Sequence, residues 1–312
     1  MRFLVVGAGA VGGYFGGRLV QHGEDVTFLV RPARKKQLEQ TGLVIKSVSG
    51  DFSGPVKVIT YDDPKETFDV IILSLKAYHL SDLKSSLSPY IGASTVILPL
   101  LNGYQHYEML WKDFGKEKVL GGLCYIESTL DSEGSIIHTS KMEDIVFGEW
   151  DGSKTERVNR IYEHLSKGGF KVAVSDNVER DIWQKYIFIA CMSGITTLLR
   201  APMGPVREVP EAKNTFARLV EEITGIARKK GASLYEDAAE RVMRTAESLH
   251  PSMKSSMLRD MEKGLPVEVD HFHGYLLQTA EQLGIKREDV PVLSAVYANL
   301  KVYEKVQGLV SK

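Results

Sequence analysis

The sequence predicts an α/β protein of two domains, with a parallel sheet in domain 1–178 and helices alone in domain 179–312. Three observations predict it. Short apolar, β-branched runs alternate with helical segments upstream of residue 178, glycines cluster directly after the first run, and the pattern downstream is helical almost throughout. The runs are FLVV, DVTFLV, DVIILSL, STVILPL, KVLGGLCYIEST and DIVFGEW. Strands that alternate with helices indicate βαβ units and a parallel sheet.

The composition bounds the class of protein. The 312 residues are 43% hydrophobic and 25% charged, as in soluble enzymes. A formal net charge of −1 provides no global field to recruit nucleic acid or an anionic membrane. Cys124 and Cys191 lie far apart, which argues against a zinc site or a disulfide framework and suits a reducing cytosol. We therefore expect a cytoplasmic protein with no nucleic-acid or membrane partner.

The N-terminal stretch MRFLVVGAGAVGGYFGGRL is predicted to be a strand, a glycine-rich turn and a helix. Its basic start and apolar run also resemble a secretory signal. A signal must form a helix, however, and each glycine inside a helix costs about 1 kcal/mol relative to alanine. A strand that ends at Gly7 fits better, followed by a helix to about His22–Gly23 and then the strand DVTFLV.

The spacing Gly7-x-Gly9-x-x-Gly12, between a strand and a helix, is the fingerprint of a dinucleotide-binding Rossmann-type domain. The first glycine permits the tight turn, the second lets the backbone approach a pyrophosphate, and the third brings helix and strand together. The helix N-terminus offers free N–H groups to the anion. The predicted cofactor contacts are Gly7, Ala8, Gly9, Ala10, Val11 and Gly12. The alternative is a tight turn that binds no ligand.

Arg31 indicates which dinucleotide binds. An Asp or Glu at the end of the second strand would bond the ribose of NAD, but here that strand ends in LVR. Arg31, followed by Arg34, Lys35 and Lys36, suits a 2′-phosphate and predicts NADP. The basic run could also be the solvated start of a helix, so we assign Arg31 alone to the cofactor.

Two further residues follow predicted strands of the sheet. Lys76 comes after DVIILSL and Asn102 after STVILPL. Because the carboxyl ends of parallel strands face the ligand crevice, both are candidates for contacts with bound ligand. The alternative for Lys76 is a solvated strand end.

The second domain opens with WQKYIFIACMSGITTLLR, in which residues 186–199 are uncharged and too few to span a bilayer. We interpret this stretch as a buried helix. Lys185 would share a helix face with Ile189, Ser193 and Thr197, four residues apart in turn. A lysine in that setting could donate a proton to a substrate oxygen. A helix-end lysine that reaches into solvent is the alternative.

Near the C-terminus, a helix is predicted to end at Lys263–Gly264, because Pro266 prevents its continuation, and a new one to begin around Glu268. Glu268 could serve only as a partner of the helix dipole. His271 and His273, two residues apart on a helix, point in different directions and cannot share an ion. We therefore assign no metal.

Together these segments resemble the ketopantoate reductases, also called 2-dehydropantoate 2-reductases. The resemblance covers nearly the whole chain. It rests, in order, on GAGAVGGYFGG, SLKAY, LLNG, WQK, SSMLRD and PVEVDHFHGYLL. It implies NADP dependence, a Rossmann-type N-terminal domain and an all-helical C-terminal domain.

The resemblance also implies a reaction, in which a hydride passes from NADPH to the ketone carbon of a 2-oxo acid. For ketopantoate the product is pantoate, on the route to pantothenate and coenzyme A. By the same resemblance Lys185 is the general acid, and Glu268 is the carboxylate that holds it protonated and the substrate in place. Asn102 and Ser256 match substrate-binding positions, and Lys76 matches a lysine that contacts cofactor and substrate. We also include Asn102 among the cofactor contacts.

One departure affects the substrate. Ile189 and Ser193 stand where many members of the family carry asparagines. Serine can still hydrogen-bond, so we keep Ser193 as a substrate contact, but isoleucine cannot. A 2-oxo acid with a more apolar far end could therefore be the substrate instead. The chain could also be a dehydrogenase of a 3-hydroxy acid or an imine, or an NADP-binding sensor without turnover. An apolar helical face could pair two copies as a homodimer.

Overall fold

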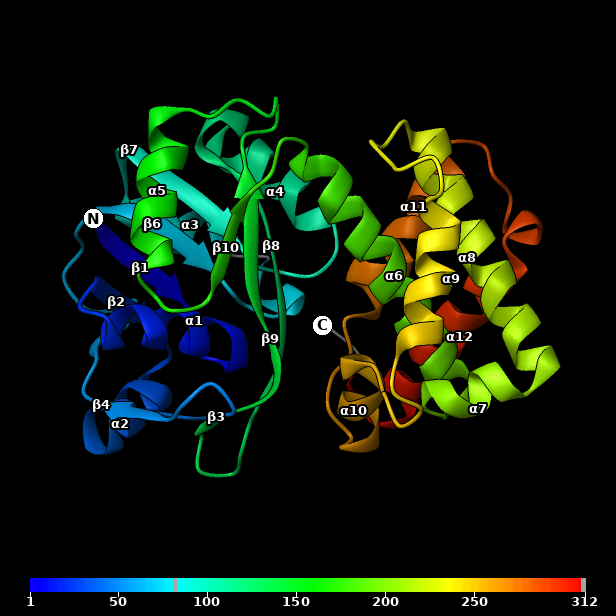
Figure 1. Ribbon diagram of the computed structural model, residues 1–312, viewed down its shortest axis with the longest axis horizontal. Helices are drawn as coiled ribbons and strands as arrows, with labels where there is room; N and C mark the ends of the chain where they lie inside the picture. The colour runs from blue at the N-terminus through cyan, green and yellow to red at the C-terminus, as the bar shows by residue number, and fades with distance from the viewer. Residues whose placement is uncertain (81–82, 310–312) are drawn as a thin grey trace. The chain divides into compact units, whose positions relative to one another are not determined.

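The computed structural model describes residues 1–80 and 83–309, and the chain forms two compact units (Figure 1). The first unit comprises Met1–Leu101 and His106–Val178. The second comprises Asn102–Gln105 and the chain from Glu179 onward. The segment Asn102–Gln105, called the Asn102 segment below, therefore groups with residues far away in the sequence. The limits 1–178 and 179–312 stay a prediction about independent domains.

The first unit contains a five-stranded sheet in the order β5-β2-β1-β6-β7. Its strands are β1 (Arg2–Val6), β2 (Asp25–Leu29), β5 (Lys57–Ile59), β6 (Phe68–Leu73) and β7 (Ile91–Pro99). All four pairings are parallel, and the central Val5 lies between Phe28 and Ile72. Numbered along the chain within this sheet the order is 3-2-1-4-5, as in a Rossmann fold. The predicted fold class is confirmed.

Helices connect the strands of this unit. They are α1 (Ala10–Gln21), α2 (Pro32–Thr41), α3 (Leu83–Leu87), α4 (Gln105–Phe114) and α5 (Glu156–Ser166), with the 3-10 turns η1 (Ala77–His79), η2 (Ser88–Tyr90) and η3 (Lys116–Lys118). The predicted first helix is confirmed, because α1 ends at Gln21 with His22 as its C-cap.

A second sheet of the first unit differs from the prediction. It has the order β10-β9-β3-β4, with β8 paired to β9. Its strands are β3 (Leu43–Ser47), β4 (Phe52–Gly54), β8 (Gly121–Leu130), β9 (Ile136–Gly148) and β10 (Lys171–Val174). We expected the last two apolar runs to continue the parallel sheet. Instead β8 and β9 form an antiparallel hairpin, because residues 131–135 are too few for a crossover helix.

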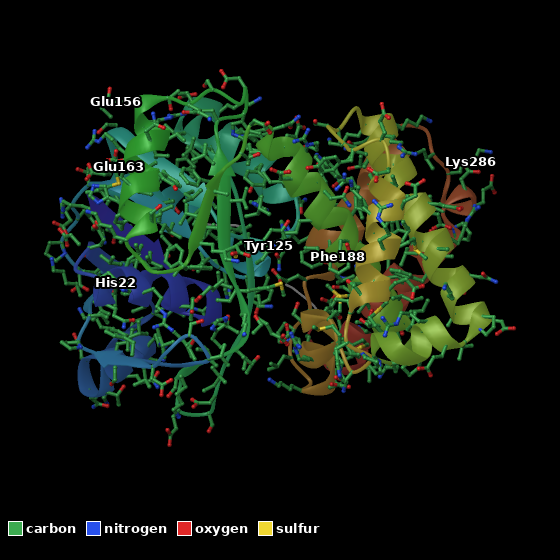
Figure 2. The ribbon with its side chains drawn as sticks, in the orientation of Figure 1. His22, Tyr125, Glu156, Glu163, Phe188 and Lys286 are labelled. Carbon is green, nitrogen blue, oxygen red and sulfur yellow. The ribbon has the colours of Figure 1, made fainter. Side chains whose placement is uncertain are left out.

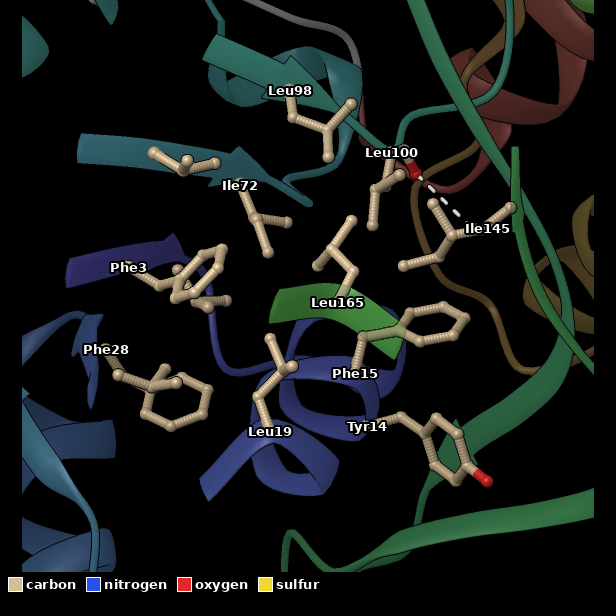
Figure 3. Packing of buried hydrophobic residues seen from close by; sticks show 14 of the residues in the cluster. Phe3, Tyr14, Phe15, Leu19, Phe28, Ile72, Leu98, Leu100, Ile145 and Leu165 are labelled. Atoms are coloured by element: carbon tan, nitrogen blue, oxygen red, sulfur yellow. Dashed lines mark hydrogen bonds between the residues drawn. The ribbon is translucent and has the colours of Figure 1, made fainter. Parts of the chain in front are cut away.

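Helix α1 packs closely against strands of both sheets, and its glycines make this approach possible. An added Cβ on Gly16 would lie 2.7 Å from the ring of Phe28 in β2. One on Gly17 would lie 2.7 Å from Ile45 in β3. Figure 3 shows the resulting core, in which side chains of α1, the parallel sheet, β9 and α5 meet. The glycines beyond the fingerprint are therefore required by packing.

The second unit is helical throughout its described part. Its elements are α6 (Val178–Leu199), α7 (Met203–Glu208), α8 (Pro210–Lys230), α9 (Ala238–Ser248), α10 (Ser256–Glu262), the π-helical turn η4 (Asp270–Gly274), α11 (Tyr275–Gln282), the 3-10 turn η5 (Arg287–Asp289) and α12 (Pro291–Val306). As predicted, α10 stops before Lys263, and Gly264 adopts a φ of +69°. The all-helical class of this unit is confirmed.

Helix α6 is the long apolar helix of this unit. Among the described residues it alone is long and apolar enough to cross a membrane by length and composition, yet 67% of its most apolar window is buried within the protein. Trp183, Tyr186 and Ile187 on it are fully or almost fully buried. The stretch predicted to be a buried helix is therefore one.

Candidate functional site

The glycine-rich loop lies between β1 and α1, and each glycine of the fingerprint has a separate structural reason. Gly7 adopts a φ of +96°, a region that side chains disfavour. At Gly9 no atom lies within 4 Å of an added Cβ, so the backbone is open on that side. An added Cβ on Gly12 would lie 2.3 Å from the carbonyl oxygen of Gly7. The loop therefore combines a tight turn, an open backbone face and a close contact.

A cavity of about 520 Å³ opens at this loop in the first unit. Of the predicted cofactor residues, Gly7, Ala8, Gly9 and Arg31 line it. Ala10, Val11 and Gly12 are not among its lining residues, although they form the first turn of α1 beside it. Arg34 also lines the cavity, although we named it only as part of the basic run and did not assign it to the cofactor. Sequence reasoning did not find four further polar or aromatic lining residues, Tyr61, Tyr78, His79 and Ser86.

The cavity is lined by Arg31, Arg34 and His79, and none of its described lining residues is acidic. Arg31, the N-cap of α2, places Nη2 at 2.5 Å from Nε2 of His79. Because a guanidinium can only donate, His79 accepts this bond. Arg34 donates to the carbonyl oxygens of Ala8 at 3.1 Å and Gly134 at 2.9 Å, and burial lowers its pKa. Both guanidinium groups thus belong to residues that line the cavity, and both are held there by hydrogen bonds to neighbouring residues.

The remaining basic candidates of the first unit differ from Arg31. Lys35 forms an ion pair with Asp63 at 2.7 Å and does not line the cavity. Lys76 is exposed and is the N-cap of η1, next to the cavity-lining Leu75. Lys76 therefore follows the end of β6 and lies beside a residue that lines the cavity. Contacts of Lys76 with a ligand stay a prediction.

In the second unit, α6 carries the predicted stripe of side chains (Figure 2 labels Phe188 on this helix). Lys185 and Ile189 are half-buried, whereas Ser193 and Thr197 are buried. Thr197 donates its hydroxyl to the carbonyl oxygen of Ser193 at 2.7 Å, and only 3% of Ser193 is exposed. The accessible part of the stripe is thus its Lys185 end, and the substrate contact of Ser193 stays a prediction.

Glu268 is half-buried and directly precedes the helix that begins at Val269, as predicted. Its carbonyl oxygen accepts the amide of Phe272 at 3.0 Å. The turn that follows is π-helical, a distortion found frequently at functional sites. Ser256 is exposed at the first position of α10, while its neighbour Ser255 caps that helix through the amide of Leu258.

The two histidines of the π turn have different partners. Nε2 of His271 lies 2.9 Å from the carbonyl oxygen of Asn102, and Nε2 of His273 lies 2.9 Å from that of Ala190. Carbonyls only accept, so both imidazoles donate. Among the described residues, no three His, Cys, Asp or Glu side chains gather as a metal site would require.

Asn102, Lys185, Glu268 and Ser256 therefore all belong to the second unit, whereas Lys76 and the glycine-rich loop belong to the first. The sequence placed Asn102 with the sheet because it follows β7. The structure groups Asn102 with the helices of the second unit. The sequence feature that could have indicated a turn of the chain away from the sheet at this point is the glycine that follows Asn102. Gly103 adopts a φ of +95° and turns the chain beneath His271.

Both parts of the chain match the same protein family. The model of the family "Ketopantoate reductase PanE/ApbA" matches residues 3–152, and that of its C-terminal part matches residues 177–304. The uncharacterized oxidoreductase YkpB of Bacillus subtilis (strain 168) is 48% identical over 97% of this chain and 99% of its own. The 2-dehydropantoate 2-reductase of Archaeoglobus fulgidus is 30% identical, over 91% and 92%.

A solved structure shows the same architecture. The PanE/ApbA family ketopantoate reductase of Ralstonia eutropha JMP134 superposes with a TM-score of 0.88 at 25% identity, over 99% of this chain and 100% of that one.

Proposed function

The chain belongs to the ketopantoate reductase family and is an oxidoreductase, and from that premise we propose that it reduces 2-dehydropantoate (ketopantoate) to pantoate with NADPH. The observation that carries the proposal is the cavity at the glycine-rich loop, which has an open backbone face and two arginines but no acidic lining residue among those described. The proposed role is a step of pantothenate and coenzyme A biosynthesis in the cytoplasm.

The loop and cavity suit a dinucleotide with a 2′-phosphate. The open face at Gly9 leaves room for a pyrophosphate against the backbone, beside the first turn of α1. Arg31 and Arg34 would pair with the phosphate, because guanidinium groups bind phosphate oxygens with charge-assisted hydrogen bonds. NADPH supplies the hydride for the reduction.

The charged residues of the second unit would supply the proton that the reduced substrate needs. As the ketone carbon gains the hydride, its oxygen becomes an alkoxide, and the Lys185 ammonium donates a proton to that oxygen. Lys185 is left as a neutral amine and regains a proton from solvent. Glu268 favours the charged form of the lysine before each turnover. Asn102, Ser256 and Lys76 would orient the substrate, and a substrate held in the reactive geometry reacts faster.

Ile189 favours a second candidate substrate. It is half-buried on the helix that carries Lys185, and its side chain offers no hydrogen bond. A 2-oxo acid with an apolar far end would gain from this contact, whereas a hydroxyl there would lose its partner. Such an acid would be reduced by the same residues. A homodimer of this enzyme also stays a prediction.

The test is NADPH oxidation with ketopantoate and with a panel of 2-oxo acids of increasing apolar size, with NADH as the control cofactor. We expect turnover of ketopantoate with NADPH. In Lys185→Ala, loss of the proton donor should lower kcat by about 10²- to 10⁴-fold. Its Kd for NADPH, measured by nucleotide fluorescence, should not change.

Competing functions would give different results in the same assay. Turnover of apolar 2-oxo acids without ketopantoate would replace the substrate and keep the mechanism. Turnover of only a 3-hydroxy acid or an imine would replace the reaction. NADPH binding without turnover of any compound would indicate a sensor.

A further inference from the structure

We propose that His271 is a positioning residue, which holds the main chain at Asn102 so that Asn102 is fixed to the helices that carry Lys185 and Glu268. The inference rests on the proposed function, because it assigns Asn102 to the substrate rather than to the nucleotide. It concerns contacts within the second unit alone.

The central contact is the bond from His271 to the backbone of Asn102. Nε2 of His271 lies 2.9 Å from the carbonyl oxygen of Asn102, and the residue is 6% exposed. A donor buried to this extent costs about 1 to 3 kcal/mol when its partner is lost. The bond therefore favours one conformation of the Asn102 main chain.

The shape of the turn depends on the same imidazole. Gly103 adopts a φ of +95°, and an added Cβ there would lie 2.7 Å from Nε2 and 2.9 Å from Cδ2 of His271. The chain thus bends directly against the ring. A side chain at residue 103 would disfavour the backbone conformation and displace His271.

The far end of the Asn102 segment is attached to α6. The ring of Tyr104 stacks on Trp183 with centroids 4.5 Å apart, and its hydroxyl donates to Glu179 at 3.2 Å. Trp183 lies two residues before Lys185. Asn102 is therefore held between an anchor on the helix of Lys185 and an anchor on the turn that follows Glu268.

The turn that carries His271 is itself fixed. The hydroxyl of Tyr186 donates to the carbonyl oxygen of Phe272 at 2.5 Å, and His273 donates to that of Ala190 at 2.9 Å. Both partners of the turn lie on α6. Lys185, Glu268 and Asn102 are consequently carried by elements that are bonded to one another.

The charge of His271 is not the means by which it acts. Burial lowers its pKa, although Glu268 and the bond to Asn102 oppose this change. The imidazole is therefore neutral near pH 7, and it acts through the geometry of its Nε2–H group. A neutral donor of the same reach should replace it.

The experiment compares His271→Gln, which keeps a donor near the Nε2 position, with His271→Met, which has a similar length and no donor. Both are assayed with NADPH and the 2-oxo acid that the wild type reduces best. We expect His271→Met to lower kcat/KM about tenfold and His271→Gln less than about threefold. The Kd for NADPH should stay unchanged in both variants.

His273 provides a matched control, since it is a buried histidine of the same turn with the same 2.9 Å bond to a carbonyl oxygen. His273→Met should lower the thermal midpoint at least as much as His271→Met but lower kcat/KM less than about threefold, because Tyr186 still bonds the turn to α6 and His271 still bonds Asn102. An equal loss of kcat/KM in both methionine variants would overturn the proposal, because it would indicate a general structural role.

A double-mutant cycle tests whether His271 acts through Asn102. In the Asn102→Ala background, His271→Met should cause no further loss of kcat/KM. Losses that multiply instead would show two independent roles and refute the proposal.

Hydrogen exchange provides a readout that needs no substrate. Amides in a peptide covering residues 102–105 should exchange faster in His271→Met, but not in His271→Gln or His273→Met. If the wild type reduces no 2-oxo acid while exchange rises, the proposed function fails and the contact with Asn102 stands. Unchanged exchange in His271→Met overturns the proposal whatever the substrate is.

Discussion

The two units form their candidate sites in opposite ways. In the first unit the glycine-rich loop exposes backbone where its glycines lack a side chain, and the open face at Gly9 is the clearest case. In the second unit the candidate groups are long side chains such as Lys185, and buried rings such as Trp183 and His271 hold their surroundings. We expect a site of backbone groups to recognise the pyrophosphate that all dinucleotides share, and a site of side chains to select one substrate.

This difference predicts opposite responses to mutation. Adding one atom should harm the first site, because the backbone must approach its neighbours closely. Removing one polar atom should harm the second site, because its geometry depends on individual hydrogen bonds. Each of the following predictions tests one side of this contrast.

The largest effect is expected in the glycine-rich loop, where Gly12→Ala is compared with Gly9→Ala. At residue 12 the new Cβ would lie 2.3 Å from the carbonyl oxygen of Gly7, and we expect a loss of about 3 kcal/mol of unfolding free energy. At residue 9 it meets no atom within 4 Å, so stability should stay within about 0.5 kcal/mol. Urea unfolding measures both.

Gly9→Ala, which should hardly change stability, should nevertheless weaken nucleotide binding. Gly9→Ala places a methyl group on the open backbone face, and we expect its Kd for NADPH to rise at least about tenfold, which is 1.4 kcal/mol. A Gly9→Ala variant that binds NADPH like the wild type would contradict our assignment of this face to the pyrophosphate.

The fold could be predicted from the sequence where local signals agreed with the tertiary structure. The apolar runs, the glycine spacing and the helical periodicity were sufficient for the parallel sheet and the helical unit. The second sheet could not be predicted, because β4 and β10 have only three and four residues and the pairing of β3 with β9 joins residues about 90 positions apart. The same long-range packing explains Gly13, Gly16 and Gly17, which sequence spacing alone left unexplained.

The residues of the candidate site could be predicted from the sequence where a local pattern locates them, and not where a long-range contact does. Arg31 and the loop glycines follow strand ends, and strand ends can be located from the pattern. The contact of His271 with Asn102 joins residues 169 positions apart, and no local pattern encodes it. The spacing of His271 and His273 on a helix excludes a shared metal ion, but it does not indicate that either imidazole bonds to the backbone.

A second prediction concerns the pH dependence of the second unit. Burial lowers the pKa of His273 to about 4, against an ordinary value of 6.5. Between these values the unfolded chain binds a proton that the folded chain does not, so stability is complete above about pH 6.5 and falls as the pH decreases. From pH 7 to pH 5 we expect His273 to account for a loss of about 2 kcal/mol.

The measurement is urea unfolding of the wild type and His273→Gln at both pH values. Glutamine keeps a donor for the carbonyl oxygen of Ala190 but does not titrate. The stability difference between the two proteins should therefore shrink by about 2 kcal/mol at pH 5. A constant difference would show that another group, such as His271, dominates the acid response.

The smallest effect is expected for Arg31→Asp, which tests whether side chains also add selectivity to the backbone site. Arg31 is exposed at the N-cap of α2, a position that aspartate suits, so folding should be unaffected. Loss of a charge-assisted bond to the 2′-phosphate should raise the Kd for NADPH about tenfold. Aspartate can accept from the ribose of NADH, whose Kd should fall or stay unchanged.

Lys35→Ala is the matched control, because Lys35 lies in the same basic run but pairs with Asp63 away from the cavity lining. If both substitutions weaken the binding of NADPH and NADH equally, the basic run acts only as a diffuse field, and our assignment of Arg31 to the 2′-phosphate is wrong. If only Arg31→Asp changes the ratio of the affinities for NADPH and NADH, backbone and side chains have different roles within the first unit as well. Its backbone would then bind what dinucleotides share, and one side chain would select between them.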